Sequence, residues 1–164
     1  MDGIIIGRFQ PFHLGHLDAL KFALSKVDNL WIGIGSSNKL NQKQNPFSAE
    51  ERKEMILSSI DRSISDKIEI FSIPDLENHK KWIENINSIV PKFDIVFTND
   101  KLTQSLYSKR GTKVISVPFT NRDVLSGTKI RNKIEFDQNW EHLVPEGTKK
   151  ILQKINAKNR LKSL

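Results

Sequence analysis

Residues 7–16 place an arginine, two histidines and two glycines directly after a run of isoleucines. The segment reads GRFQPFHLGH and follows Ile4-Ile5-Ile6. A guanidinium presents several N–H donors in one plane, and an imidazole can donate, accept or bind a metal. The segment could therefore bind a metal, bind an anion, or be an ordinary loop.

A metal site has little support from the residue types. His13 and His16 lie three residues apart, which suits two ligands on one helical turn. A zinc ion needs four protein ligands, or three protein ligands and a water molecule. The chain has no cysteine, and the spacing connects neither His79 nor His142 to the pair. We therefore expect no metal bound directly by side chains.

The glycine-rich nucleotide motifs are incomplete. Residues 33–38, Gly-Ile-Gly-Ser-Ser-Asn, follow a second apolar run but lack the third glycine and the following helix of a dinucleotide fingerprint. A Walker A sequence is absent. We expect Gly33 and Gly35 to allow close backbone approach at the end of a strand.

Direct phosphate binding accounts for more of the segment. Gly7 would let the chain turn after a strand, and Arg8 would supply a multidentate cation. His13 and His16 would flank the start of a helix, whose free N–H groups and dipole favour an anion. Gly15 would keep the first turn bare. On spacing alone, a loop without a ligand remains the alternative.

Short apolar runs alternate with helical patterns along the whole chain. Strands are predicted at 3–6, 30–34, 68–73, 94–98 and 113–117, and helices at 14–26, 48–60, 82–90, 101–108, 126–136 and 146–155. The pattern predicts an α/β fold, a Rossmann-like doubly wound parallel sheet of about five strands with helices on both faces. We expect one domain over 1–164, with its C-terminal helices starting near 126. Ligands of such sheets bind at the carboxyl ends of the strands, where the first strand would place residues 7–16.

Composition narrows the possible partners. The 164 residues are 37% hydrophobic and 27% charged, as in an ordinary globular protein. No apolar run could span a membrane, and Asp2 stands where a signal peptide would carry lysine, so we expect a cytoplasmic protein. The net charge of +7 favours anionic partners. Many lysine and arginine side chains lie near the C-terminal end of the chain, but no aromatic residues interleave with them. We therefore expect a solvated helix there and no nucleic-acid or membrane partner.

Two motifs then resemble a known superfamily. H-x-G-H at 13–16, after a first strand, resembles the signature of the nucleotidyltransferase superfamily of adenylyl- and cytidylyltransferases. Its second signature, S-[ST]-T-x-[ILV]-R, resembles Ser-Gly-Thr-Lys-Ile-Arg at 126–131. Two motifs in the right order, over a hundred residues apart, are far more specific than either alone.

Other segments resemble the archaeal-type nicotinamide mononucleotide (NMN) adenylyltransferases in particular. They are residues 7–16, NPFSAEER at 45–52, residues 75–82, WEHLVP at 140–145 and the glycine within SGT. The resemblance extends from Gly3 to about Leu161. Residues 98–100 are Thr-Asn-Asp where the family often has Ser-Gly-Asn, and residues 38–44 lack the histidine or arginine often found there.

The resemblance implies that ATP and NMN are joined to give NAD and pyrophosphate, by in-line attack of the NMN phosphate on the α-phosphorus. A phosphate is already a nucleophile, so neither a strong base nor a covalent intermediate is needed. Mg²⁺ held mainly by the ATP phosphates and a homo-oligomeric state are implied as well. Three alternatives stay open. They are a related adenylyl- or cytidylyltransferase (pantetheine-phosphate, FMN or glycerol-phosphate acceptor), a basic nucleic-acid-binding domain, and an inactive NAD-binding regulatory domain.

The resemblance also assigns residues. His16 would lie nearest the α-phosphate, assisted by His13, with Arg8 as a clamp and Arg131 neutralising the leaving pyrophosphate. Ser126 and Thr128 would cap a helix beginning at Thr128, whose N–H groups would bind the β- and γ-phosphates. The expected ATP site comprises Gly7, Arg8, Phe9, His13, Gly15, His16, Arg122, Ser126, Gly127, Thr128 and Arg131. An ordinary N-cap and a solvated surface arginine are the alternatives for this second motif.

The NMN side rests on fewer residues. Asp75 and Asn99 are expected at strand ends beside the site, where an asparagine could bind the carboxamide or ribose. Each could equally form a local turn. Trp82 would stack on the nicotinamide ring, although Trp82, Ile86 and Ile89 also form a plain core stripe. Trp31 and Trp140 are assigned to the core.

Overall fold

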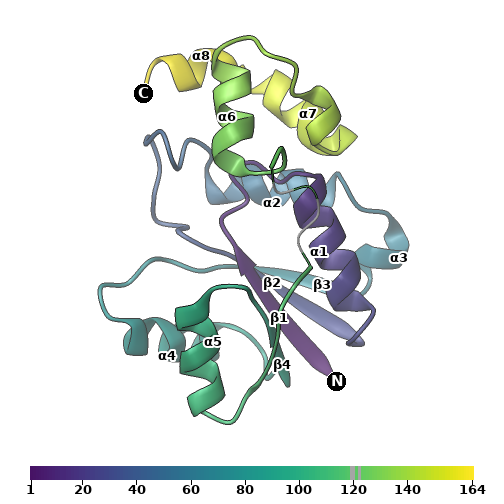
Figure 1. Cartoon of the computed structure of the whole chain (residues 1–164), viewed down its shortest axis with the longest axis vertical. Coiled ribbons are helices and arrows are strands. Elements are labelled where there is room, and N and C mark those ends of the chain that lie inside the picture. Colours follow the sequence, from purple (N-terminus) through teal and green to yellow (C-terminus); the bar gives the residue numbers. More distant parts are fainter. Residues whose placement is uncertain (119–120, 122) are drawn as a thin grey trace.

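The computed structural model describes residues 1–118, 121 and 123–164. Within these residues, five parallel strands form one sheet in the order β3-β2-β1-β4-β5, and Figure 1 labels β1 to β4. The strands are β1 (Asp2–Gly7), β2 (Asn29–Ile34), β3 (Ile68–Ser72), β4 (Ile95–Phe97) and β5 (Lys113–Ile115). The chain extends the sheet from β1 to one side and later returns to the other side of β1. The order therefore reverses between β1 and β4, which is where a doubly wound sheet opens a crevice.

Helices connect the strands and follow the last one. They are α1 (Leu14–Leu24), α2 (Ala49–Leu57), α3 (Arg62–Ser65), α4 (His79–Ile89), α5 (Lys101–Lys109), α6 (Gly127–Glu135), α7 (Glu146–Lys154) and α8 (Ala157–Lys162), with a 3₁₀ turn η1 (Glu141–Leu143). The sequence missed α3, η1 and α8, which are too short to show a helical period. Asn156, with φ of 52°, separates α8 from α7.

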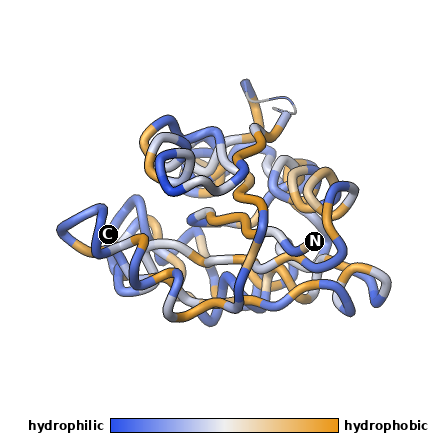
Figure 2. Tube along the Cα trace, turned by 90° about the horizontal axis from the view of Figure 1, so that it is seen from below, coloured by the Kyte–Doolittle hydropathy of each residue, from blue (hydrophilic) through white to orange (hydrophobic). Residues whose placement is uncertain are grey.

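Alternate residues of β1 face two different cores. Ile5 lies in a core with residues of α1, α2 and α6, whereas Ile4 lies in a second core with residues of α4 and α5. Hydrophobic stretches accordingly run through the middle of the molecule, and hydrophilic segments lie on its outer loops (Figure 2). Helices on both faces of a parallel sheet confirm the predicted Rossmann-like fold.

The predicted stripe on α4 was partly wrong. Ile83 and Ile86 are fully buried, whereas Ile89 is 37% exposed. Ile83, Ile86 and Val90 follow the three- and four-residue steps of one helix face, and Ile89 lies beside that face.

The last three helices cover one end of the molecule, above the sheet in Figure 1. Helix α7 packs on α2, and α8 packs on α6. Arg160 of α8 donates two hydrogen bonds to the Glu51 carboxylate at 2.6 and 2.9 Å, and Lys158 pairs with Asp137. Part of the basic C-terminal stretch is thus neutralised within the chain. None of the helices in the described ranges has the length and apolar character needed to cross a membrane.

Candidate active site

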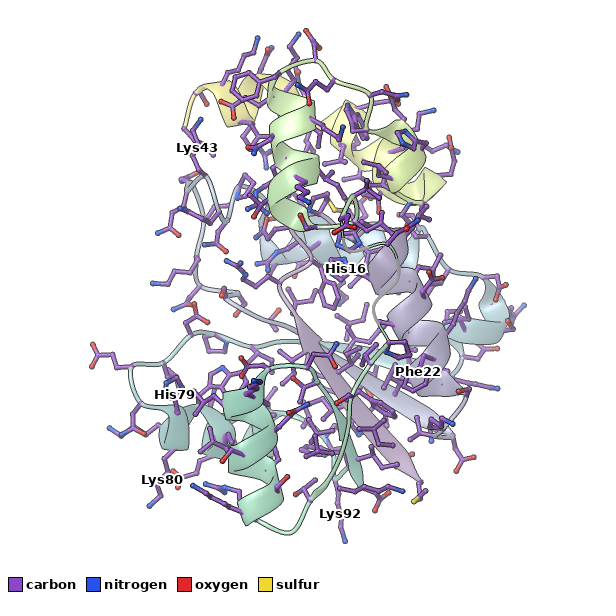
Figure 3. All side chains as sticks on the ribbon, in the orientation of Figure 1. His16, Phe22, Lys43, His79, Lys80 and Lys92 are labelled. Atoms are coloured by element: carbon purple, nitrogen blue, oxygen red, sulfur yellow. The ribbon has the colours of Figure 1, made fainter. Side chains whose placement is uncertain are left out.

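Two cavities meet at the carboxyl end of β1. The first, of about 440 Å³, lies between α1, the ends of β4 and β5, and the start of α6, and its walls include Phe9, His13, His16, Asn99 and Ser126. The second, of about 670 Å³, lies beside α4 and α5, and its walls include Arg8, Ser36, Asp75, His79 and Trp82. Ile6, Gly7 and Asp100 line both. Figure 3 shows His16 below α6 and His79 at α4, on the two sides of this junction.

His13 and His16 cap helix α1 reciprocally. His13 is the N-cap, and its Nδ1 accepts from the N–H groups of Gly15 at 3.1 Å and His16 at 3.3 Å. The Nδ1 of His16 accepts from the His13 N–H at 3.1 Å. The two rings stack with their centroids 3.6 Å apart. This arrangement is a capping box built from imidazoles instead of a hydroxyl and a carboxylate.

The hydrogen bonds assign one tautomer to both histidines. An Nδ1 that accepts a hydrogen bond carries no proton, so a neutral imidazole must carry it on Nε2. Burial lowers the pKa of His13 to about 4. Burial, and then the proximity of His13, hold the pKa of His16 well below its usual value. At neutral pH the pair therefore offers two neutral Nε2–H donors on the wall of the first cavity.

The prediction that the first turn of α1 has free N–H groups was wrong for Gly15 and His16. The N–H groups of Gly15 and His16 are already capped by His13. A Cβ on Gly15 would lie 2.9 Å from Cε1 of His13, so glycine makes room for the folded-back ring. Two of the main-chain donors at the start of α1 are thus already used within the chain.

The sequence predicts a turn at Gly7, but the chain turns after β1 at Phe9 instead. Phe9 is 3% exposed and has a left-handed backbone with φ of 52°. Its ring meets the edge of the His16 ring, with centroids 4.9 Å apart. A Cβ on Gly7 would lie 2.9 Å from the Phe9 ring, so Gly7 provides space for that ring.

Arg131 is buried rather than solvated, so the surface-arginine alternative was wrong. It is 7% exposed, and its Nη1 donates to the Gln10 carbonyl at 2.7 Å. Its Nη2 lies 3.4 Å from the Thr128 hydroxyl. Burial, followed by the nearby charge of Arg8, lowers the pKa of Arg131 to about 10. The guanidinium of Arg8 itself is exposed on the wall of the second cavity.

Helix α6 begins at Gly127, one residue after the start predicted from periodicity and one residue before the start implied by the resemblance. Ser126 is the N-cap, and its hydroxyl accepts from the Lys129 N–H at 3.2 Å. Among the described residues, no acceptor meets the N–H groups of Gly127 and Thr128, which also lack a partner within the helix. Ser126 lines the first cavity. The helix start is thus open to an anion at this point.

The space around residue 127 explains why this position is a glycine. A Cβ on Gly127 would lie 2.8 Å from the Arg131 Nη1 and 3.0 Å from the Gln10 carbonyl oxygen. Any side chain here would press on the hydrogen bond that joins the two sequence motifs.

The residues expected on the NMN side are divided between the cavities. Asp75 lies on the wall of the second cavity, where its Oδ1 accepts from the Ser36 hydroxyl at 3.0 Å. Trp82 is half-buried on the same wall and also packs against the second core, so its place in the core is confirmed and its stacking on a nicotinamide ring stays a prediction. Asn99 lines the first cavity, and its amide exchanges two 2.8 Å hydrogen bonds with the Val117 main chain. Arg122 lies outside the described residues.

Sequence reasoning missed two buried polar residues that hold the site together. Arg52 is fully buried and donates only to main-chain carbonyls of the surrounding loops. Gln10 is 3% exposed, and its side-chain amide exchanges two 3.0 Å hydrogen bonds with the Phe47 main chain. The available signal for Gln10 was its position between Phe9 and Pro11-Phe12, whereas Arg52 follows two glutamates and precedes a lysine, so the sequence shows no sign of its burial.

Asp100 is a further residue of the site that the sequence did not single out. Its Oδ2 accepts from the hydroxyl and the N–H of Thr103, which together lower the pKa of the carboxyl. Within the described part of the chain, no group of three or more histidine or acidic side chains could hold a metal ion. Asp100 is therefore a single ionised carboxylate at the junction of the two cavities.

The chain is similar to known nucleotidyltransferases over its full length. A cytidylyltransferase-like family model matches residues 4–133. The nicotinamide-nucleotide adenylyltransferase of Thermococcus sibiricus is 40% identical over 166 residues, covering 100% of this chain and 89% of the relative. A bifunctional NMN adenylyltransferase/ADP ribose pyrophosphatase from Francisella tularensis superimposes with a TM-score of 0.84 at 25% identity, covering 99% of this chain and 52% of that one. The chain thus spans about half of that bifunctional protein. A second structure of it, complexed with AMP and a manganese ion, gives a TM-score of 0.82 at 23% identity, covering 99% and 52%.

Proposed function

The chain belongs to the cytidylyltransferase-like family and, within it, to the nicotinamide-nucleotide adenylyltransferases, and we propose that its two cavities are the ATP and NMN sites of this activity. It is a nucleotidyltransferase that joins ATP and NMN to give NAD and pyrophosphate. The assignment of each cavity and each residue follows from the chemistry of the two walls.

ATP occupies the first cavity in this proposal. The Nε2–H groups of His13 and His16 and the open start of α6 supply donors for its phosphates, with His16 nearest the α-phosphate. NMN occupies the second cavity, where the Trp82 indole offers a stacking surface for the nicotinamide ring and the Arg8 guanidinium a partner for the phosphate. The reacting phosphates then meet at Gly7, which lines both cavities.

The reaction is an in-line attack of the NMN phosphate on the α-phosphorus of ATP. The residues do not need to remove a proton, because the attacking oxygen is already anionic. They hold two polyanions together and stabilise the charge that shifts onto the leaving pyrophosphate. Neutral Nε2–H donors suit this task because they need no change of protonation before ATP binds. Arg131 lines neither cavity, but it lies next to Thr128 at the start of α6, and this proximity supports a role of its charge in stabilising the β- and γ-phosphates.

A divalent cation, Mg²⁺ in the cell, is carried into the site on the ATP phosphates in this proposal. The residues fit such a cation because Asp100, at the junction of the cavities, is ionised and can meet it through water. Such a cation would supply positive charge that offsets the negative charge of the ATP phosphates. The predictions of a homo-oligomer, a cytoplasmic location and no nucleic-acid or membrane partner stay predictions.

The reciprocal capping of His13 and His16 is the observation that carries this assignment, because it leaves two pinned donors on one cavity wall. The direct test incubates the purified chain with Mg²⁺ and ATP and each acceptor in turn: NMN, phosphopantetheine, FMN and glycerol phosphate, the last also with CTP. We expect NAD formation to exceed every other product by orders of magnitude. Faster transfer to another acceptor would favour a related transferase. No transfer together with salt-sensitive binding of nucleic acid would favour the binding domain.

A further inference from the structure

Arg52 is a buried cation whose described partners are all main-chain oxygens. Its Nη1 donates to the carbonyls of Arg8 at 2.8 Å and Gly35 at 2.7 Å. Its Nη2 lies 3.4 Å from the Ser36 carbonyl oxygen, and its Nε donates to the Ser48 carbonyl at 3.2 Å. Arg52 is 0% exposed, and none of the described carboxylates forms an ion pair with it. Burying such a charge is costly, so the hydrogen bonds must serve a purpose that an apolar side chain could not.

The loops that Arg52 joins both contain a strained residue. Phe9, directly after Arg8, has φ of 52°, and Ser36 has φ of 50°. Residues other than glycine avoid this left-handed region, and they remain there only where the surrounding structure fixes them. Arg52 holds a carbonyl next to the first strained residue and the carbonyl of the second.

A second buried arginine holds the other side of Phe9. Arg131 donates to the Gln10 carbonyl at 2.7 Å, so the carbonyls before and after Phe9 are each bound by a buried guanidinium. The Phe9 ring, fixed in this way, lies against the edge of His16. On the other loop, the Ser36 hydroxyl donates to Asp75 on the wall of the second cavity.

We propose that Arg52 is a positioning residue for adenylyl transfer: by binding the carbonyls of Arg8, Gly35 and Ser36, it locks the loops after β1 and β2. The inference rests on the proposed function, because the locked loops carry Arg8 and support His16 and Asp75. Arg52 itself lines neither cavity and acts through these loops. The positive charges of Arg8 and Arg52 repel each other, and phosphates bound at Arg8 would relieve that repulsion.

Arg52→Lys tests the proposal, because lysine keeps the charge, but its ammonium ends one bond short of Nη1, which donates to both loops, and it cannot also replace the Nε and Nη2 donors. We expect kcat for NAD synthesis to fall about 100-fold, as for a small misplacement of reacting groups, with much smaller changes in both KM values. The ring-current shift of the His16 Hε1 resonance should change as Phe9 moves. Met55→Ala is the matched control, since Met55 lies in the same helix, is equally buried and lines neither cavity. It should destabilise the fold and leave kcat unchanged below the unfolding temperature.

Wild-type kcat in Arg52→Lys, or an equal loss of kcat in Met55→Ala, would overturn the proposal. Arg52→Gln is the second variant if the lysine variant does not fold, with the same expected loss. The wild-type protein gives an independent reading: the Arg52 Nε–H resonance should shift when NAD is added, and no shift would also overturn the proposal. NAD synthesis by the wild type is measured in the same series. Its absence would reject the proposed function rather than the role of Arg52.

Discussion

The guanidinium of Arg131 donates a 2.7 Å hydrogen bond to the carbonyl of Gln10, across 121 residues of sequence. This contact joins the two motifs that flank the sheet into one structural unit. It also explains why residue 127 is glycine, since a Cβ there would lie within 3.0 Å of both partners. The proposed phosphate site therefore depends on a contact between its supporting residues and not only on the residues that face the cavity.

Gly127→Ala should disrupt the hydrogen bond between Arg131 and the Gln10 carbonyl. The added methyl group must displace Arg131 or the Gln10 carbonyl, and overpacking of this kind costs about 1–3 kcal/mol of unfolding free energy. We expect kcat/KM for ATP to fall by about tenfold or more, because the start of α6 moves with it. Asn132→Ala is the control, an exposed position on the same helix that should change neither quantity. Unchanged stability and kinetics in Gly127→Ala would show that the contact is dispensable.

Stability should depend on pH through the buried histidines. The pKa of His13 falls from 6.5 to about 4 on folding, so the unfolded chain binds more protons between these values. The stabilisation is complete above pH 6.5 and is lost as the pH falls towards 4, by at most about 3 kcal/mol for this residue. His13→Asn keeps an oxygen that can cap the helix but removes the titrating group. Urea unfolding of both proteins from pH 7.5 to 4 should give a shallower decline for the variant, and parallel curves would contradict the assignment.

Trp82 should determine affinity for NMN. If its indole stacks on the nicotinamide ring, Trp82→Ala raises the KM for NMN by about tenfold or more while the KM for ATP changes little, and Trp82→Phe recovers part of the loss. Trp31→Phe is the matched control, since Trp31 packs against the same core and lies outside both cavity walls. Equal changes in both KM values for Trp82→Ala would favour the purely structural interpretation.

The sequence predicted the fold and the two motifs but not how the motifs are held. Periodicity was sufficient for the sheet, because strands such as Ile4–Ile6 and helices such as α1 each have one dominant pattern. The bend at Phe9 was assigned to Gly7, since glycine is the usual left-handed residue and only tertiary contacts can hold a phenylalanine there. Arg52 and Gln10 were missed because burial of a polar residue depends on contacts from distant segments. The use of both histidine Nδ1 atoms as caps likewise depends on ring orientation, which residue types do not specify.

The proposed donation from His16 to the transferring phosphate can be measured through NAD synthesis by His16→Ala. Removing a preorganised donor to a reacting oxyanion lowers kcat by about 100- to 1,000-fold. We expect such a loss for His16→Ala at saturating ATP and NMN, in a variant shown to be folded. His142→Ala, which removes a histidine outside both cavities, should retain wild-type kcat. Wild-type NAD synthesis by folded His16→Ala would contradict the account.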